Sequence, residues 1–134
     1  MKEIDEVNLP ENFRYVETHE WARIAGDTVI VGITDYAQDH LGDLTFIELP
    51  QVGDVFQKGE QCGTLESTKA VSDIFMPVSG EILAVNGALL DSPGLVNSDP
   101  YGDGWLLELK PENYEEIDAL LTAEAYREML GGLE

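Results

Sequence analysis

The residues with the clearest chemical potential are those from 66 to 73, which centre on Lys69. The chain has four lysines against 27 acidic residues. Short β-forming runs flank the stretch at residues 63–65 and 74–76, and no glycine or proline interrupts it. The pattern predicts a hairpin whose tight, small-residue turn holds the Lys69 amine clear of the body. Such a lysine suits covalent modification, because a modifying enzyme must surround it. The simpler alternative is a solvated surface charge.

Length and composition limit the class of protein. The chain has 134 residues, of which 43% are hydrophobic, so it is long enough to fold as one domain around a core. Its formal net charge of −20 argues against nucleic acids and anionic membrane surfaces as partners, because both require a positively charged face. The same charge favours partners with basic surfaces, although it can also serve solubility alone.

Cysteine usage and the N-terminal residues indicate a compartment. Cys62 is the only cysteine, which excludes an intramolecular disulfide and a thiolate zinc cluster, and we expect no metal. Residues 1–6 lack the features of a signal or transit peptide, and no apolar run is long enough to cross a membrane. We expect a bacterial-type cytoplasmic protein, or one of the mitochondrial matrix if a transit peptide has been removed.

Turn signals at short intervals predict a mainly β body. Gly-Asp dipeptides begin at positions 26, 42, 53 and 102, each beside an apolar run. In the run 28–33, Val29, Val31 and Ile33 alternate toward one face. The remaining strands are expected at residues 13–16, 21–24, 44–49, 81–85 and 105–109, with a further short strand between the two turns of residues 53–60.

A short internal helix is expected over residues 34–41. Asp35 is its predicted N-cap, Gln38 three residues later would complete a capping box, and Gly42 would end the helix. Such a helix would interrupt the strands without adding a second domain.

The two ends of the chain are expected to differ in structure. Residues 1–12 predict a flexible N-terminal lead-in, which leaves residues 13–134 as a single domain. The Asn86-Gly87 dipeptide favours a turn, and residues 88–104 an ordered loop.

A C-terminal helical segment is expected from about residue 112. Asn113 would cap its first helix, with Glu116 completing a capping box, and Thr122 would cap a second one. Helices at the end of a β body commonly cover a sheet edge or a core face.

Several motifs in a fixed order resemble lipoyl and biotinyl carrier domains. They are Gly-Asp-x-x-x-x-Gly-Glu at 53–60, Glu-Ser-x-Lys-Ala at 66–70 and Pro-x-Ser-Gly-Glu-Ile at 77–82. Other pieces are similar to the H-protein family of the glycine cleavage system, among them His-Glu-Trp at 19–21 and Asn-Ser-Asp-Pro-Tyr-Gly at 97–102. The resemblance runs from about residue 13 to the C-terminus.

This resemblance implies a flattened β-barrel, the barrel-sandwich hybrid of lipoyl domains. The family's modified lysine falls on Lys69, which would carry lipoate through an amide on its ε-nitrogen. Glu66, Ser67, Ala70 and Asp73 would be the hairpin residues that the lipoylating enzyme recognises. The protein itself would be a carrier and not an enzyme, because the demanding chemistry belongs to cofactors.

The resemblance also implies a set of partners. The lipoyl arm would accept the aminomethyl group left when glycine loses carbon dioxide on glycine decarboxylase, the pyridoxal-phosphate P protein. It would present that group to the tetrahydrofolate-dependent aminomethyltransferase, the T protein. Dihydrolipoamide dehydrogenase, the FAD-containing L protein, would reoxidise the dithiol, and a lipoate ligase or octanoyltransferase would load the arm. We expect a monomer.

A cleft for the loaded arm is also implied, because an aminomethyl thiol loses formaldehyde easily in water. By position, the family's amine-receiving residues are Thr18, Glu20 and Asp73. Two carboxylates next to a protonated amine make a favourable charge-assisted contact. The alternative is that these three are ordinary surface polar groups.

Other functions remain open from the residues alone. Biotin attachment is disfavoured because methionines usually flank a biotinylated lysine, and Lys69 lacks them. A lipoyl domain of a 2-oxo acid dehydrogenase would lack the His-Glu-Trp motif and the terminal helices. An enzyme would depend on His19 or His40 as a base, and we expect both to be structural. A lipoate relay to other carriers is a further alternative.

Overall fold

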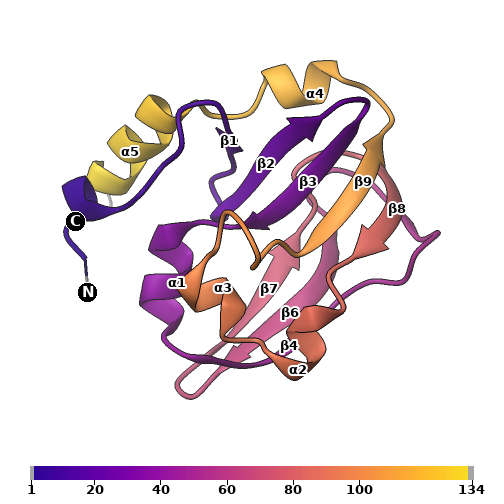
Figure 1. Ribbon diagram of the computed structural model, residues 1–134. Coiled ribbons are helices and arrows are strands. Elements are labelled where there is room, and N and C mark those ends of the chain that lie inside the picture. The colour runs from indigo at the N-terminus through magenta and orange to yellow at the C-terminus, as the bar shows by residue number, and fades with distance from the viewer. Residues whose placement is uncertain (1, 133–134) are drawn as a thin grey trace.

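The structure is a computed structural model that describes residues 2–132, and it is built from two antiparallel sheets (Figure 1). The larger sheet has the strand order β1-β2-β3-β9-β8-β5 and the smaller β4-β6-β7. The strands are β1 (Arg14–Tyr15), β2 (Glu20–Ala25), β3 (Thr28–Ile33), β4 (Leu44–Glu48), β5 (Val55–Phe56), β6 (Gln61–Ser67), β7 (Val71–Phe75), β8 (Gly80–Val85) and β9 (Leu107–Pro111). The helices are the 3-10 turn η1 (Ile4–Glu6), α1 (Asp35–Leu41), α2 (Ala88–Asp91), α3 (Leu95–Ser98), α4 (Glu115–Asp118) and α5 (Ala123–Gly132).

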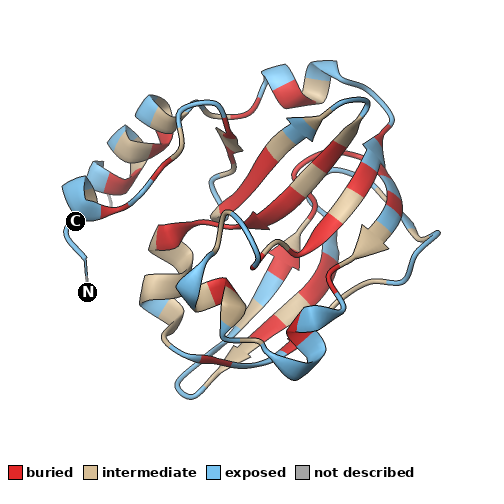
Figure 2. Cartoon of the chain, in the orientation of Figure 1, coloured by how far each residue is buried: buried red, intermediate tan, exposed pale blue. Residues whose placement is uncertain are grey.

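Buried residues of both sheets form a mainly aliphatic core, and Figure 2 marks the buried positions along the strands. Val29 and Val31 of β3 are fully buried, and so is Ile74 of the smaller sheet. The predicted alternation of β3 is therefore confirmed, because a strand with one face on a core buries every second side chain. No backbone pairing joins the two sheets within residues 2–132, so the predicted flattened barrel takes its sandwich form.

The N-cap of helix α1 lies one residue earlier in the chain than predicted. Its N-cap is Thr34, whose Oγ1 accepts the backbone N–H of Ala37 at 3.2 Å, and not the predicted Asp35. Asp35 is the first helical residue, and its carboxylate accepts Gln38 Nε2 at 2.8 Å. The predicted end at Gly42 is confirmed by a left-handed φ of 75° there.

The N-terminal residues pack more closely than a flexible lead-in would. Val7 and Leu9 are buried at 3% and 7% exposure. The backbone N–H of Asn8 donates to Asp35 at 2.8 Å, and its carbonyl accepts the hydroxyl of Tyr101 at 2.6 Å. Val7 and Leu9 alternate in the sequence and are the apolar signal in this otherwise charged segment. The flexibility of residues 1–12 stays a prediction. A domain boundary at residue 13 stays a prediction.

The predicted loop 88–104 contains the one-turn helices α2 and α3. The turn predicted at Asn86-Gly87 is confirmed, since the Asn86 carbonyl accepts the N–H of Leu89 at 3.1 Å. The Asn86 side-chain amide closes the segment by donating to the carbonyls of Asp103 and Trp105, both at 2.8 Å. The buried side chains of Leu89 and Val96 add this segment to the core.

The C-terminal helical segment is confirmed, with two changes in its capping. Thr122 caps α5 by accepting the N–H of Ala125 at 3.2 Å, as predicted. The N-cap of α4 is Tyr114 and not the predicted Asn113, whose Oδ1 accepts the N–H of Glu115 at 2.9 Å. Glu116 does not complete a capping box there, since its carboxylate accepts the N–H of Ser79 at 2.9 Å.

An aromatic cluster forms a second core between α5, β1 and the N-terminal segment (Figure 1). Tyr15 and Tyr126 stack there with ring centroids 5.1 Å apart. Its buried members are Val7, Leu9, Phe13, Tyr15, Trp21, Tyr126 and Leu130. The helices within residues 2–132 are all too short or too polar to span a membrane.

Candidate functional site

Lys69 lies in the turn between β6 and β7, at the tip of a hairpin that extends from the smaller sheet (Figure 1). Ser67 shapes that turn: its Oγ accepts the backbone N–H groups of Lys69 at 3.3 Å and of Ala70 at 3.1 Å. Its own N–H donates to the Ala70 carbonyl at 2.8 Å. None of residues 67–70 has a positive φ, so the turn needs no glycine, and the serine hydroxyl bonds its backbone. The hairpin prediction is confirmed.

The Lys69 side chain is exposed, but it does not stand clear of the body. Its stem lies over Gly42 at the end of α1, so that a Cβ built on Gly42 would lie 3.2 Å from Lys69 Cε. The turn thus presents the lysine to solvent, while its side chain runs toward α1. The sequence could not show this contact, because residues 42 and 69 lie far apart along the chain.

A cleft of about 260 Å³ lies beside the hairpin, between β2, α1 and the paired strands β6 and β7. It brings together Thr18, Glu20 and Asp73, the three residues that the resemblance assigned to amine contact. Apolar side chains and two histidines complete its walls. The lining residues are Thr18, His19, Glu20, Ile33, Tyr36, Ala37, His40, Leu41, Leu65, Ser72 and Asp73.

Glu20 supplies a buried carboxyl group to this cleft. It is 1% exposed. One carboxylate oxygen accepts the hydroxyl of Thr18, and the other accepts the backbone N–H of Phe75 at 3.1 Å. Burial raises the pKa of Glu20 to about 7, although both hydrogen bonds favour the ionised form. The carboxyl group therefore exchanges its proton near neutral pH, and a cation in the cleft would shift it toward the carboxylate.

Asp73 holds the opposite, solvent-exposed side of the cleft. Its carboxylate accepts Gln61 Nε2 at 2.9 Å. Glu66 and Ala70 lie on the hairpin outside the cleft lining, and the Glu66 carbonyl accepts the hydroxyl of Thr45 at 3.2 Å. The predicted residues thus divide into a hairpin set and a cleft set, with Asp73 in both.

Two histidines and a tyrosine were not predicted to line the cleft. The rings of His19 and Tyr36 have centroids 4.9 Å apart, and those of Tyr36 and His40 4.0 Å apart. Burial lowers the pKa of His19 and favours its neutral form. The spacing of Tyr36 and His40, four residues apart on one helix, could have indicated a shared face.

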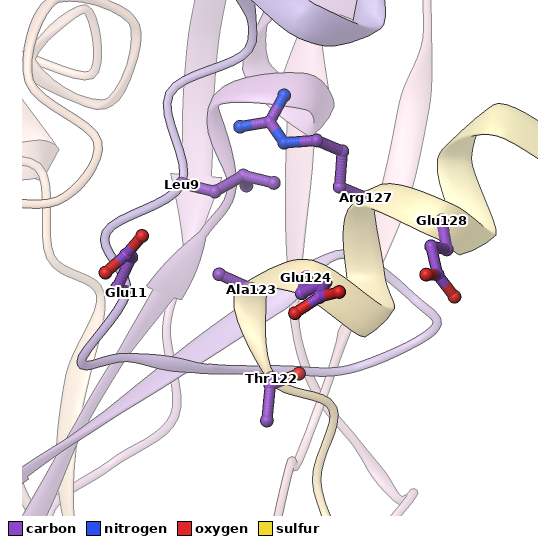
Figure 3. A pocket seen from close by; sticks show the side chains of 7 residues that line it. All are labelled: Leu9, Glu11, Thr122, Ala123, Glu124, Arg127 and Glu128. Atoms are coloured by element: carbon purple, nitrogen blue, oxygen red, sulfur yellow. The ribbon is translucent and has the colours of Figure 1, made fainter.

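Two other candidates have no link to this cleft. A larger depression of about 730 Å³ lies between α5 and the N-terminal segment, and it contains none of the predicted site residues (Figure 3). Arg127, beside it, donates to the carbonyls of Ile4 and Val7. Cys62 is buried, which raises the pKa of its thiol to about 12 and leaves it without nucleophilic character. Residues 2–132 contain no cluster of three potential metal ligands.

Comparison with known proteins identifies the family of this chain. Residues 13–132 match the family described as glycine cleavage H-protein. This chain belongs to that family. It is 55% identical to a glycine cleavage system H protein of Thermus thermophilus over 92% of this chain and 97% of that one. It is 49% identical to the H protein of Bacteroides thetaiotaomicron over 94% of this chain and all of the relative.

A solved structure from the H-protein family supports the fold. The crystal structure of a glycine cleavage system H protein from Mycobacterium marinum aligns with a TM-score of 0.85 and 44% sequence identity. The alignment covers 92% of this chain and 99% of the other. The resemblance drawn from the motifs is thereby confirmed for the family and the fold.

Proposed function

We propose that this chain is the lipoyl carrier of a glycine cleavage system, with Lys69 as the attachment residue. The observation that carries the proposal is the exposed Lys69 beside a cleft with a buried carboxyl group. The lysine is accessible to a lipoate ligase or octanoyltransferase, and Glu66, Ser67, Ala70 and Asp73 are the hairpin residues that such an enzyme would contact. Membership of the H-protein family supports the same role.

The cleft residues fit a lipoyl arm with an amine at its end. Ile33, Leu41 and Leu65 offer an apolar wall for the carbon chain, while Glu20 and Asp73 offer carboxyl groups to a cation. When bound, lipoate supplies the disulfide that takes up the aminomethyl group of glycine. The protein would contribute the lysine that carries the arm, the apolar wall of the cleft, carboxyl groups that bind the ammonium of the loaded arm, and shelter from water.

The expected partners follow from this role. They are glycine decarboxylase with pyridoxal phosphate, the tetrahydrofolate-dependent aminomethyltransferase and the FAD-containing dihydrolipoamide dehydrogenase. The charge of −20 supports association with basic partner surfaces. The carrier would have no catalytic residue of its own. The monomeric state and the cytoplasmic location stay predictions.

The test is intact mass and peptide mapping of protein from cells supplied with lipoate. Wild type and the control Lys58→Arg should gain one lipoyl group on Lys69, and Lys69→Arg should gain none while keeping its circular dichroism spectrum. Lys58 is a suitable control because it is also an exposed lysine in a turn. A biotin adduct, or a lipoyl group on Lys58, would refute the proposal.

A further inference from the structure

The C-terminal helix reaches the cleft through one buried hydroxyl group. Tyr126 of α5 is fully buried, and its hydroxyl oxygen lies 2.7 Å from Nδ1 of His19 and 2.9 Å from Oγ1 of Thr34. His19 is part of the cleft lining, and Thr34 precedes helix α1, which supplies further lining residues. His19 and Thr34 precede Tyr126 by 107 and 92 residues in the chain.

At His19, the hydroxyl fixes a turn with an unusual backbone. His19 has a φ of 77°, the only positive value for a residue other than glycine within residues 2–132. Its N–H donates to the Val16 carbonyl at 2.8 Å, and its carbonyl accepts the N–H of Thr34 at 3.0 Å. Side chains with a Cβ rarely adopt this conformation unless the surroundings enforce it. The turn carries Thr18 and Glu20 on either side of His19, so its orientation sets where their oxygens lie.

The same hydroxyl also contacts the residue that precedes α1. Thr34 is the N-cap of that helix. Helix α1 supplies Tyr36, His40 and two apolar residues to the cleft. The same oxygen therefore fixes the turn before β2 relative to the helix that faces it.

One direction of proton donation satisfies every atom of this network. The N–H of Ala37 donates to Thr34 Oγ1, the Thr34 hydroxyl donates to Tyr126, and the Tyr126 hydroxyl donates to His19 Nδ1. In the reverse direction the Thr34 proton would lack a partner among these groups. A neutral His19 with its proton on Nε2 is the tautomer that accepts at Nδ1.

We propose that Tyr126 is a positioning residue for the amine-receiving cleft: its hydroxyl joins His19 and Thr34 and so holds Glu20 and α1 in register. The inference rests on the proposed carrier function. It makes the C-terminal helix part of the site, although that helix contributes no residue to the cleft lining.

The test compares Tyr126→Phe with the matched control Tyr15→Phe. The Tyr15 hydroxyl is also buried in the aromatic cluster, but it donates to the Pro10 carbonyl at 2.7 Å, away from the cleft. The first measurement is ¹⁵N NMR of the imidazoles in unmodified protein at mildly alkaline pH. Wild type and Tyr15→Phe should hold His19 as the Nε2–H tautomer, and Tyr126→Phe should show a mixture of tautomers.

The second measurement is formaldehyde release from lipoylated, aminomethyl-loaded protein. Loss of the Tyr126 hydroxyl, with its hydrogen bonds to His19 and Thr34, should speed release roughly two- to tenfold in Tyr126→Phe, with no change in Tyr15→Phe. Equal release from both variants, or a His19 tautomer that is the same in Tyr126→Phe as in wild type, would overturn the inference alone. If wild type releases formaldehyde as fast as free aminomethyl-lipoamide, the cleft does not protect its cargo, and the proposed role of the cleft fails with the inference.

Discussion

Replacing Glu20 by glutamine should change how the free energy of unfolding depends on pH. The carboxyl group is 1% exposed, and burial raises its pKa from 4.5 to about 7. Because the folded state binds this proton more tightly than the unfolded chain, Glu20 makes its full contribution to stability below pH 4.5. That contribution falls as pH rises from 4.5 to 7. At 1.36 kcal/mol for each pKa unit, the difference between the two pKa values corresponds to about 3 kcal/mol.

Glutamine has nearly the same shape as glutamate, but its side chain does not ionise. Its amide oxygen can accept the Phe75 N–H, and its NH₂ group can donate to the Thr18 hydroxyl, which has lone pairs to accept it. Relative to wild type, Glu20→Gln should therefore gain about 3 kcal/mol between pH 4.5 and about 8. Urea unfolding at several pH values measures the difference, and the many other carboxylates cancel in it.

The control is Glu17→Gln, an exposed carboxylate in the same turn. It removes one negative charge without removing a buried group. The reasoning is refuted if the stability difference between wild type and Glu20→Gln stays constant across this pH range. That result would mean that Glu20 stays ionised in the fold despite its burial.

Three further predictions concern packing, loop closure and charge. Gly32→Ala should destabilise the fold by about 1–3 kcal/mol and shift the fluorescence of buried Trp21, because the new alanine Cβ would lie 2.5 Å from the Trp21 indole. The control Gly26→Ala, at a position with φ 68° and no atom within 4 Å of the added Cβ, should leave the fluorescence unchanged. Asn97→Ala should lower the thermal unfolding temperature, with a cost of about 1–3 kcal/mol, because Asn97 joins the N–H of Leu44 to the carbonyl of Gly42; an unchanged temperature would contradict this. Association with glycine decarboxylase should weaken as salt is added, since the chain carries a charge of −20, and a flat salt profile in a binding titration would argue that the charge serves solubility only.

The sequence predicted the parts of the fold that depend on local pattern. The run 28–33 forms β3 with its expected inner face, and Gly42 and Thr122 marked helix ends correctly. Local sequence could not decide the N-cap of α1, because the neighbouring residues Thr34 and Asp35 are both of types that cap helices well. The Asp35 carboxylate instead binds the N-terminal segment, because it accepts hydrogen bonds from the distant Lys2 and Asn8.

The candidate site was predictable from two kinds of signal. The local hairpin pattern singled out Lys69 and the family motifs gave its modification and the three amine-contact residues, and the structure gathers Thr18, Glu20 and Asp73 at one cleft. The environment of Glu20 was not predictable, because its burial depends on strands from distant parts of the chain. The contact between Tyr126 and His19 lies still further from any local signal, since 107 residues separate the two.

The division of the fold into two sheets has a consequence for synthesis on the ribosome. The three strands that carry the Lys69 hairpin occupy residues 44–75, whereas the larger sheet needs both β1 and β9. Tyr126, whose hydroxyl joins His19 and Thr34, is translated later still. A nascent chain therefore holds every strand of its acceptor hairpin well before the contacts between its two ends can form. Chains that stop before α5 would retain the lysine and its three strands, but would lack the link between the turn that carries Glu20 and helix α1.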